Sequence, residues 1–173
     1  MEQIIEITSQ VPAVGWIVFV MGLGLLFLGK RKPSIRGRAR VIDGDSIVVD
    51  GHQVRIAGID APEMGQVMYA NGQAVNTGKI ARAHLARLIG KGQVSCRVLG
   101  QDKYGRRLAV CYNHRGADLG KAMVRAGMAQ AYGYRTRGQA KKYRRTQAWA
   151  RMTRKGLWAK GSAWNPAAWR RAN

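Results

Sequence analysis

The pattern of hydrophobic and polar positions separates an apolar N-terminal stretch from a longer region of short, alternating segments. Residues 11–29 contain no charged side chain. A helix of this length, rising about 1.5 Å per residue, would span about 28 Å, which is enough to cross a bilayer. We therefore predict one transmembrane anchor over residues 11–29. A cleaved secretory signal and a buried globular helix are the alternatives, but the acidic residues before the stretch do not resemble a signal peptide.

The charges that flank this stretch bear on its orientation. No Lys or Arg precedes it, whereas Lys30, Arg31, Lys32, Arg36, Arg38 and Arg40 follow it. The positive-inside rule favours a single-pass protein with a cytoplasmic C-terminal domain. The same basic cluster could belong to a nucleic-acid surface, so the extracytoplasmic side stays open.

After a predicted basic linker at 30–36, the pattern changes to short strands and helices. Strands are expected at 38–42, 46–49, 53–57, 94–99 and 107–112. Helices are expected from a cap at Asn76 or Thr77 to Gly90, near 119–126 and over 139–155. The first three strands should form a meander, because Asp50-Gly51 is a strong hairpin signal. The pattern predicts a mainly β protein with helices (β+α), a five-stranded OB-type barrel with about three helices, preceded by one transmembrane helix.

Composition adds a binding partner to this picture. Thirty Lys and Arg oppose nine Asp and Glu, and the formal net charge of +21 indicates nucleic acid or an anionic membrane surface. Charge alone is equally compatible with a binder that has no chemistry. Seven acids follow the apolar stretch, and four of them fall in the motifs Asp43-Gly44-Asp45 and Asp60-Ala61-Pro62-Glu63. Carboxylates retained on an anion-attracting surface indicate a site for a hard cation.

The cysteines and histidines offer no zinc pattern. Cys96 and Cys111 should lie on the apolar side of two paired strands. They could form two buried thiols or a disulfide, and the cytoplasmic orientation favours thiols. His52, His84 and His114 are dispersed and are expected in turns or on the surface.

Three motifs supply groups for phosphodiester hydrolysis. These motifs are the turn at 42–46, the strand and acidic loop at 55–63, and the sequence Asp102-Lys103-Tyr104-Gly105-Arg106. Hydrolysis requires an oriented water, neutralisation of charge on the phosphate and a stabilised leaving oxygen, which a divalent cation and arginines can provide. Each motif alone is compatible with an ordinary turn, but their conjunction in a chain with few acids favours a catalytic site.

From about Arg38 to Trp158 the chain resembles the staphylococcal nuclease (thermonuclease) family. The resemblance rests on the three motifs, on residues 123–129 (MVRAGMA) and on the ending Lys155-Gly156-Leu157-Trp158. It implies an OB-barrel nuclease domain at 37–158 that uses Ca²⁺ to cleave DNA or RNA by hydrolysis that leaves 3′-phosphate ends. We expect the protein to be a monomer, and residues 159–173 form a basic, Trp-containing tail outside the match.

The resemblance also implies roles for individual residues. Asp45, Asp60 and the backbone carbonyl of Ala61 would bind Ca²⁺, with Asp43 behind them. Glu63 would orient or deprotonate the attacking water, and Arg55 and Arg106 would hold the scissile phosphate. The remaining substrate contacts would come from Lys103, Tyr104, Tyr132 and Tyr134. Ala61 and Ser46 each replace a common Thr of the family.

Two other functions are compatible with parts of the sequence. A non-catalytic, membrane-tethered OB module that binds nucleic acid would explain the charge but has no need of the acids. A membrane-surface protein would explain the anchor and the basic cluster but not Asp45, Asp60 and Glu63 together. The tail at 159–173 could pack on the barrel or contact nucleic acid.

Overall fold

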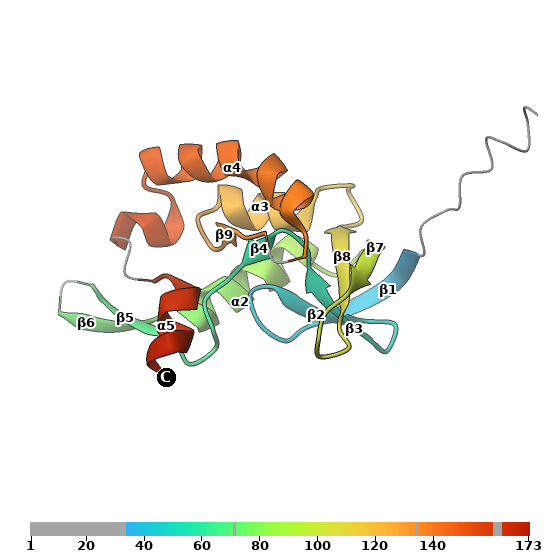
Figure 1. Cartoon of the computed structure of the whole chain (residues 1–173), viewed down its shortest axis with the longest axis horizontal. Helices are drawn as coiled ribbons and strands as arrows, with labels where there is room; N and C mark the ends of the chain where they lie inside the picture. Colours follow the sequence, from blue (N-terminus) through green and yellow to red (C-terminus); the bar gives the residue numbers. More distant parts are fainter. Residues whose placement is uncertain (1–33, 71, 134, 161–163) are drawn as a thin grey trace, which may run out of the picture. The chain divides into compact units, whose positions relative to one another are not determined.

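The computed structural model describes residues 34–70, 72–133, 135–160 and 164–173. Within this part of the chain, five strands close into a barrel in the order β1-β2-β3-β8-β7. Figure 1 shows the barrel with helices gathered beside it. The strands are β1 (Ser34–Val41), β2 (Ser46–Val49), β3 (His52–Ile56), β7 (Gln93–Gln101) and β8 (Arg107–Tyr112). The predicted β+α barrel is confirmed.

Strand pairing follows the alternation of the sequence. β1, β2 and β3 form the predicted antiparallel meander, and β3 closes the barrel by pairing in parallel with β8. Alternate residues point inward, so that each strand contributes apolar side chains to one core. This core includes Ile47, Val49, Val54, Ile56, Val94, Cys96, Ala109 and Cys111.

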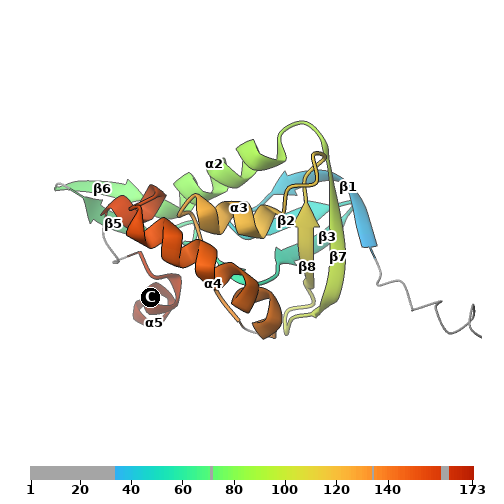
Figure 2. The same ribbon diagram turned by 90° about the horizontal axis from the view of Figure 1, so that it is seen from above.

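Three helices pack on the barrel, with α3 in contact with both α2 and α4 (Figure 2). They are α2 (Thr77–Ile89), α3 (Leu119–Arg125) and α4 (Arg137–Met152). The predicted cap of α2 is confirmed, because the Asn76 side chain accepts a hydrogen bond from the backbone N–H of Lys79 at 2.8 Å. Asp118 caps α3 and also accepts hydrogen bonds from the hydroxyl of Tyr143, which ties α4 to α3.

The buried face of α2 differs from the predicted one by a small rotation. Ala81, Leu85 and Ile89 are buried, whereas Ile80 and His84 are only half-buried. Hydrophobicity favours Ile80 over Ala81 at the interface, but a small side chain is needed where the helix approaches the turn that contains Gly44.

The structure adds elements that the pattern did not predict. β4 (Ile59–Asp60) pairs with β9 (Gln130–Ala131), and β5 (Val67–Ala70) forms a hairpin with β6 (Gln73–Asn76). The 3-10 helix η1 (Gly156–Lys160) and the helix α5 (Pro166–Ala172) follow α4. Fully buried Trp164 joins Met68 and Leu157 in a second apolar cluster, so the tail packs against the domain.

Two predictions about the chain need correction. The linker at 30–36 is wrong from Ser34 onward, because β1 begins there and pairs with β7. The preference for free thiols is also wrong, since Cys96 and Cys111 are cross-strand partners joined by a disulfide, with Cα atoms 4.1 Å apart. Alternation had placed both sulfurs inside the barrel, and the closed register then brings them together.

The predicted anchor at 11–29 lies outside the described residues. Among the residues that are described, no helix has the length and hydrophobicity needed to cross a membrane.

Candidate active site

Two acidic segments meet at one end of the barrel. Asp45 ends the turn between β1 and β2, and Asp60 lies on β4. The turn is held by the carboxylate of Asp43, which accepts a hydrogen bond from the Asp45 backbone N–H at 2.9 Å. Gly44 allows close contact, because a Cβ at this position would lie 2.6 Å from the Cβ of Ala61. This contact brings the two carboxylates together.

Arg55 bridges the two buried carboxylates. Its Nη1 lies 2.8 Å from Oδ1 of Asp45, and its Nη2 lies 2.8 Å from Oδ1 of Asp60. Residue exposure is 3% for Asp45 and 2% for Asp60, so water screens these contacts weakly. Arg55 extends from β3, whose pairing with β2 places it opposite Ser46. The sequence prediction that Asp45, Asp60 and Arg55 lie in one site is consistent with this arrangement.

The nearby positive charge does not fully stabilise the ionised form of Asp45. Burial raises its pKa to about 7, although the attraction of Arg55 and a hydrogen bond from the Ala61 backbone N–H oppose this rise. Nearby Asp43 and Asp60 add repulsion. Because the guanidinium of Arg55 does not offset burial and repulsion at Asp45, this carboxylate would gain from a further positive charge.

Arg106 is aimed by Asp102 within the hairpin between β7 and β8. The Asp102 carboxylate accepts hydrogen bonds from the backbone N–H groups of Tyr104 and Arg106 and from Nε of Arg106 at 2.8 Å. A second guanidinium nitrogen of Arg106 lies 3.4 Å from Oγ of Ser46. The first motif and the third motif are therefore brought to the same place, as expected.

Glu63 lies on the loop between β4 and β5, and buried Gln66 holds this loop. The Gln66 backbone N–H donates to the Glu63 carbonyl at 2.8 Å, and its side-chain oxygen accepts from the Glu63 N–H at 3.2 Å. The carbonyl of Gln66 accepts from Thr77 at the start of α2. Its side-chain nitrogen donates to the Trp164 carbonyl at 2.7 Å. Gln66 thus fixes Glu63 against α2 and the tail.

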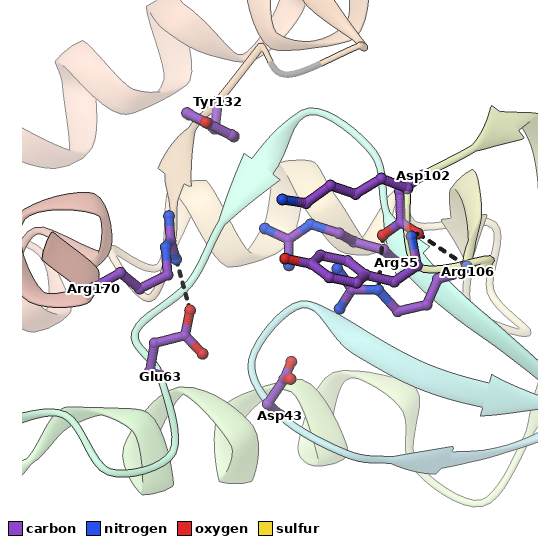
Figure 3. Close-up of a pocket in the computed structure, with 9 residues that line it drawn as sticks. Asp43, Arg55, Glu63, Asp102, Arg106, Tyr132 and Arg170 are labelled. Atoms are coloured by element: carbon purple, nitrogen blue, oxygen red, sulfur yellow. Dashed lines mark hydrogen bonds and ion pairs between the residues drawn. The ribbon is translucent and has the colours of Figure 1, made fainter. Parts of the chain in front are cut away.

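Arg170 of α5 enters the site, a contact that the sequence analysis did not predict. Its Nη1 lies 2.6 Å from Oε1 of Glu63, and its Nη2 lies 2.8 Å from Oδ2 of Asp60. Figure 3 shows its side chain reaching from the helix toward Glu63. Hydrogen bonds with Asp60 and Glu63 raise the pKa of Arg170, so it is charged at any ordinary pH.

A cavity of about 400 Å³ lies at this end of the barrel. Its lining includes Asp43, Arg55, Glu63, Asp102, Lys103, Tyr104, Arg106, Tyr132 and Arg170. The ring of exposed Tyr104 lies 4.8 Å from Nζ of Lys103 and 5.5 Å from Cζ of Arg106. Tyr132 is positioned by its backbone N–H, which donates to the Gly58 carbonyl at 2.9 Å. Tyr134 lies outside the described residues.

No group of three or more His, Cys, Asp or Glu side chains is arranged to hold a metal within the described residues. The oxygen donors nonetheless suit a hard cation, because Asp45 and Asp60 are buried carboxylates that face each other across Arg55. The carboxylates of Asp60 and Glu63 already bind one positive group, the guanidinium of Arg170. A divalent cation is therefore chemically compatible with the residues present.

Three functional residues were missing from the predicted site. Asp102 was visible in its motif, where an acid four residues before Arg106 is a usable signal. Gln66 and Arg170 gave no such signal, because their roles depend on the tail folding back onto residues far away in the chain, and Gln66 is separated from Trp164 by 98 positions. Arg170 is separated from Glu63 by 107 positions.

Comparison with known proteins identifies relatives of this chain. Residues 53–160 match the family model described as staphylococcal nuclease homologue. A micrococcal nuclease of Shigella flexneri is 35% identical over 146 residues, which cover 78% of this chain and 79% of that protein.

Two further relatives extend the comparison. The protein ParB of Escherichia coli is 33% identical over 151 residues, covering 80% of each chain. A probable endonuclease lcl3 of Pyrenophora tritici-repentis is 34% identical over 114 residues, covering 62% of this chain and 41% of that protein. The family match covers more than half of the chain and includes Arg55, Asp60, Glu63 and Arg106. This chain therefore belongs to the staphylococcal nuclease family.

Proposed function

We propose that this protein is a calcium-dependent nuclease that hydrolyses phosphodiester bonds of DNA or RNA. The observation that carries the proposal is the meeting of Asp45, Asp60, Arg55, Glu63 and Arg106 around one end of the barrel. These residues come from three separate motifs. A surface that only binds nucleic acid would gain nothing by placing carboxylates beside its phosphate-binding arginines.

In this proposal, Asp45 and Asp60 hold the cation together with the backbone carbonyl of Ala61, and Asp43 supports the turn behind them. Calcium would supply fixed positive charge to the phosphate as negative charge develops on it. The raised pKa of Asp45 supports this assignment, since the carboxylate needs more positive charge than Arg55 provides.

Glu63 is the proposed base that orients or deprotonates the attacking water. It lies on the wall of the cavity and its side chain is 35% exposed, so water can reach it. Arg55 and Arg106 are the proposed phosphate clamp, because planar guanidinium groups can donate paired hydrogen bonds to phosphate oxygens. Asp102 would keep Arg106 directed into the cavity.

The substrate would continue from the cavity over exposed side chains. Lys103 and Tyr104 form one edge, and Tyr132 borders both this cavity and a basic hollow that contains Arg135, Arg137, Lys141 and Arg144. Aromatic rings can stack on bases while cations follow the phosphates. We propose Tyr134 as a further contact, and 3′-phosphate ends as the product, on the family resemblance alone.

The decisive experiment is digestion of plasmid DNA and of RNA by the full-length chain in detergent, with calcium or with a chelator. We expect cleavage only with calcium. Glu63→Ala should lower the rate by about 10²–10⁴-fold, which is typical of losing a general base. Arg106→Ala should lower it by about 10²–10³-fold, as when a preorganised donor is removed.

Arg107→Ala is the matched control, because Arg107 is exposed on the neighbouring position of β8 and does not line the cavity. It removes the same charge and should retain nearly normal activity. Absence of calcium-dependent cleavage by the wild type, together with salt-sensitive binding, would favour the non-catalytic OB module instead.

We further propose that residues 11–29 attach the protein to a membrane as a single-pass anchor and that the enzyme acts as a monomer. The flanking charges support a cytoplasmic catalytic domain. The disulfide between Cys96 and Cys111 supports the opposite side, because such bonds persist in oxidising compartments.

A further inference from the structure

The C-terminal helix places a guanidinium on two carboxylates that the proposed reaction requires. Both oxygens of Asp60 accept hydrogen bonds from Arg170, at 3.2 Å for Oδ1 and 2.8 Å for Oδ2. The same guanidinium donates to Oε1 of Glu63 at 2.6 Å. Arg170 thus binds a proposed cation ligand and the proposed base at once.

The helix is docked by several contacts besides this ion pair. Trp164 is fully buried, and its carbonyl accepts a hydrogen bond from buried Gln66 at 2.7 Å. Asn165 caps α5, and Pro166 is buried at its start. The ring of Trp169 lies over Gly65, since a Cβ on that glycine would be 3.8 Å from it. Arg170 is therefore delivered by a packed segment and not by a loose terminus.

We infer that Arg170 is an internal competitor of the divalent cation and that α5 is an autoinhibitory arm, an inference that rests on the proposed function. Both oxygens of Asp60 are already engaged by guanidinium groups, since Arg55 and Arg170 contact Oδ1 and Arg170 also contacts Oδ2. A divalent cation that bound Asp60 would therefore be repelled by Arg170 and would have to displace it from Oδ2. A carboxylate of Glu63 that accepts a charged hydrogen bond is also less available to a water molecule. The helix α5 must move Arg170 away from Asp60 and Glu63 before the divalent cation can bind.

Arg170 is better explained as a competitor than as a third phosphate ligand. Its guanidinium is directed at Asp60 and Glu63, as Figure 3 shows for Glu63. Arg106, in contrast, uses Nε for Asp102 and points its other nitrogens toward Ser46 and the cavity. Arg170 also differs from Arg55, because it contacts Glu63, the proposed base, whereas Arg55 contacts only Asp45 and Asp60.

The test compares Arg170→Gln with Arg171→Gln in the full-length chain. Both substitutions remove one positive charge from α5, but Arg171 is exposed and does not line the cavity. Calcium affinity is measured by titration calorimetry without substrate. Arg170→Gln should bind calcium about tenfold more tightly, because a ligand's apparent affinity falls with the fraction of competent molecules. Arg171→Gln should match the wild type.

A second variant and a second readout separate competition from misfolding. Trp169→Ala keeps Arg170 but loosens the helix, so it should also tighten calcium binding. Hydrogen exchange in residues 166–173 should accelerate when calcium is added to the wild type, because the arm is released. Circular dichroism and the thermal midpoint of each variant establish that the barrel is folded.

Each outcome separates this inference from the proposed function. If the wild type binds calcium and Arg170→Gln binds it with equal or lower affinity, autoinhibition is refuted while the nuclease proposal stands. Weaker binding of a short oligonucleotide by Arg170→Gln, with calcium affinity unchanged, would make Arg170 a substrate ligand and also refute it. If neither wild type nor variant binds calcium, both proposals fail.

Discussion

At the scale of single residues, Asp102 shows how a buried carboxylate can position an arginine. Burial alone would raise the pKa of Asp102, but hydrogen bonds from the Arg106 side chain and from the Tyr104 backbone lower it below the ordinary value of 3.8. The ionised form is therefore favoured by folding. Asp102 stabilises the fold above about pH 4, and this contribution is lost as the pH falls through the lowered pKa.

We predict that Asp102→Asn flattens the acid side of the stability profile. The free energy of unfolding, measured in urea between pH 2 and pH 7, should fall less steeply on acidification than in the wild type. Activity at neutral pH should fall by up to about 10²-fold, because Arg106 loses the charge that orients it. Asp50→Asn is the control, since Asp50 is exposed in a turn whose φ of 48° suits Asn. If the free energy of unfolding of Asp102→Asn falls with acidification as steeply as that of the wild type, the proposed ionised Asp102–Arg106 pair is contradicted.

At the scale of elements, the approach of α2 to the Glu63 loop decides where the proposed base lies. Gly78 belongs to the first turn of α2 and is buried. A Cβ at this position would collide with the Glu63 carbonyl and would lie 2.7 Å from Cα of Met64. The loop and the helix can touch only because this residue has no side chain.

We predict that Gly78→Ala displaces the Glu63 loop. Overpacking should cost about 1–3 kcal/mol of stability, and activity should fall further than stability alone explains. The thermal midpoint and the rate of plasmid cleavage measure the two effects. Gly138→Ala provides the comparison, because a Cβ there meets nothing within 4 Å inside α4 and Ala is the better helix former. Equal thermal midpoints and equal cleavage rates of the two variants would show that Gly78 does not position the Glu63 loop.

At the scale of the whole molecule, the disulfide links folding to the cellular compartment. Cys96 and Cys111 close a loop with a sequence separation of 15 between two barrel strands. A loop of this size should stabilise the fold by about 3 kcal/mol.

We predict that the double variant Cys96→Ala/Cys111→Ala unfolds at a lower urea concentration and that its stability no longer responds to reductant, whereas the wild type loses stability when reduced.

Alkylation after unfolding without reductant should label no thiol in the wild type isolated from its native membrane. Protease should then reach the catalytic domain from outside intact cells. Two labelled thiols and a protected domain would instead support the cytoplasmic orientation.

Much of the barrel and the site could be predicted from the sequence because the signals are local. Alternation at Val54 and Ile56 fixes which face of β3 is buried, and Asp50-Gly51 fixes the turn before it. The three motifs that together supply the acids and arginines each lie within nine residues of chain, at 42–46, 55–63 and 102–106. Their residue types indicate hydrolysis of a phosphodiester before any contact is known.

Only the tertiary structure decided which distant segments meet. Ala81 displaces the more hydrophobic Ile80 from the core because Gly44 comes close to it, and the register of β7 and β8 joins Cys96 to Cys111. Arg170 reaches Glu63 because buried Trp164 docks the tail. The sequence by itself determined the three motifs that supply the acids and arginines of the site, since charge and periodicity are properties of neighbouring residues. The contact of α5 with the site depends on packing between residues far apart in the chain, which no local pattern encodes.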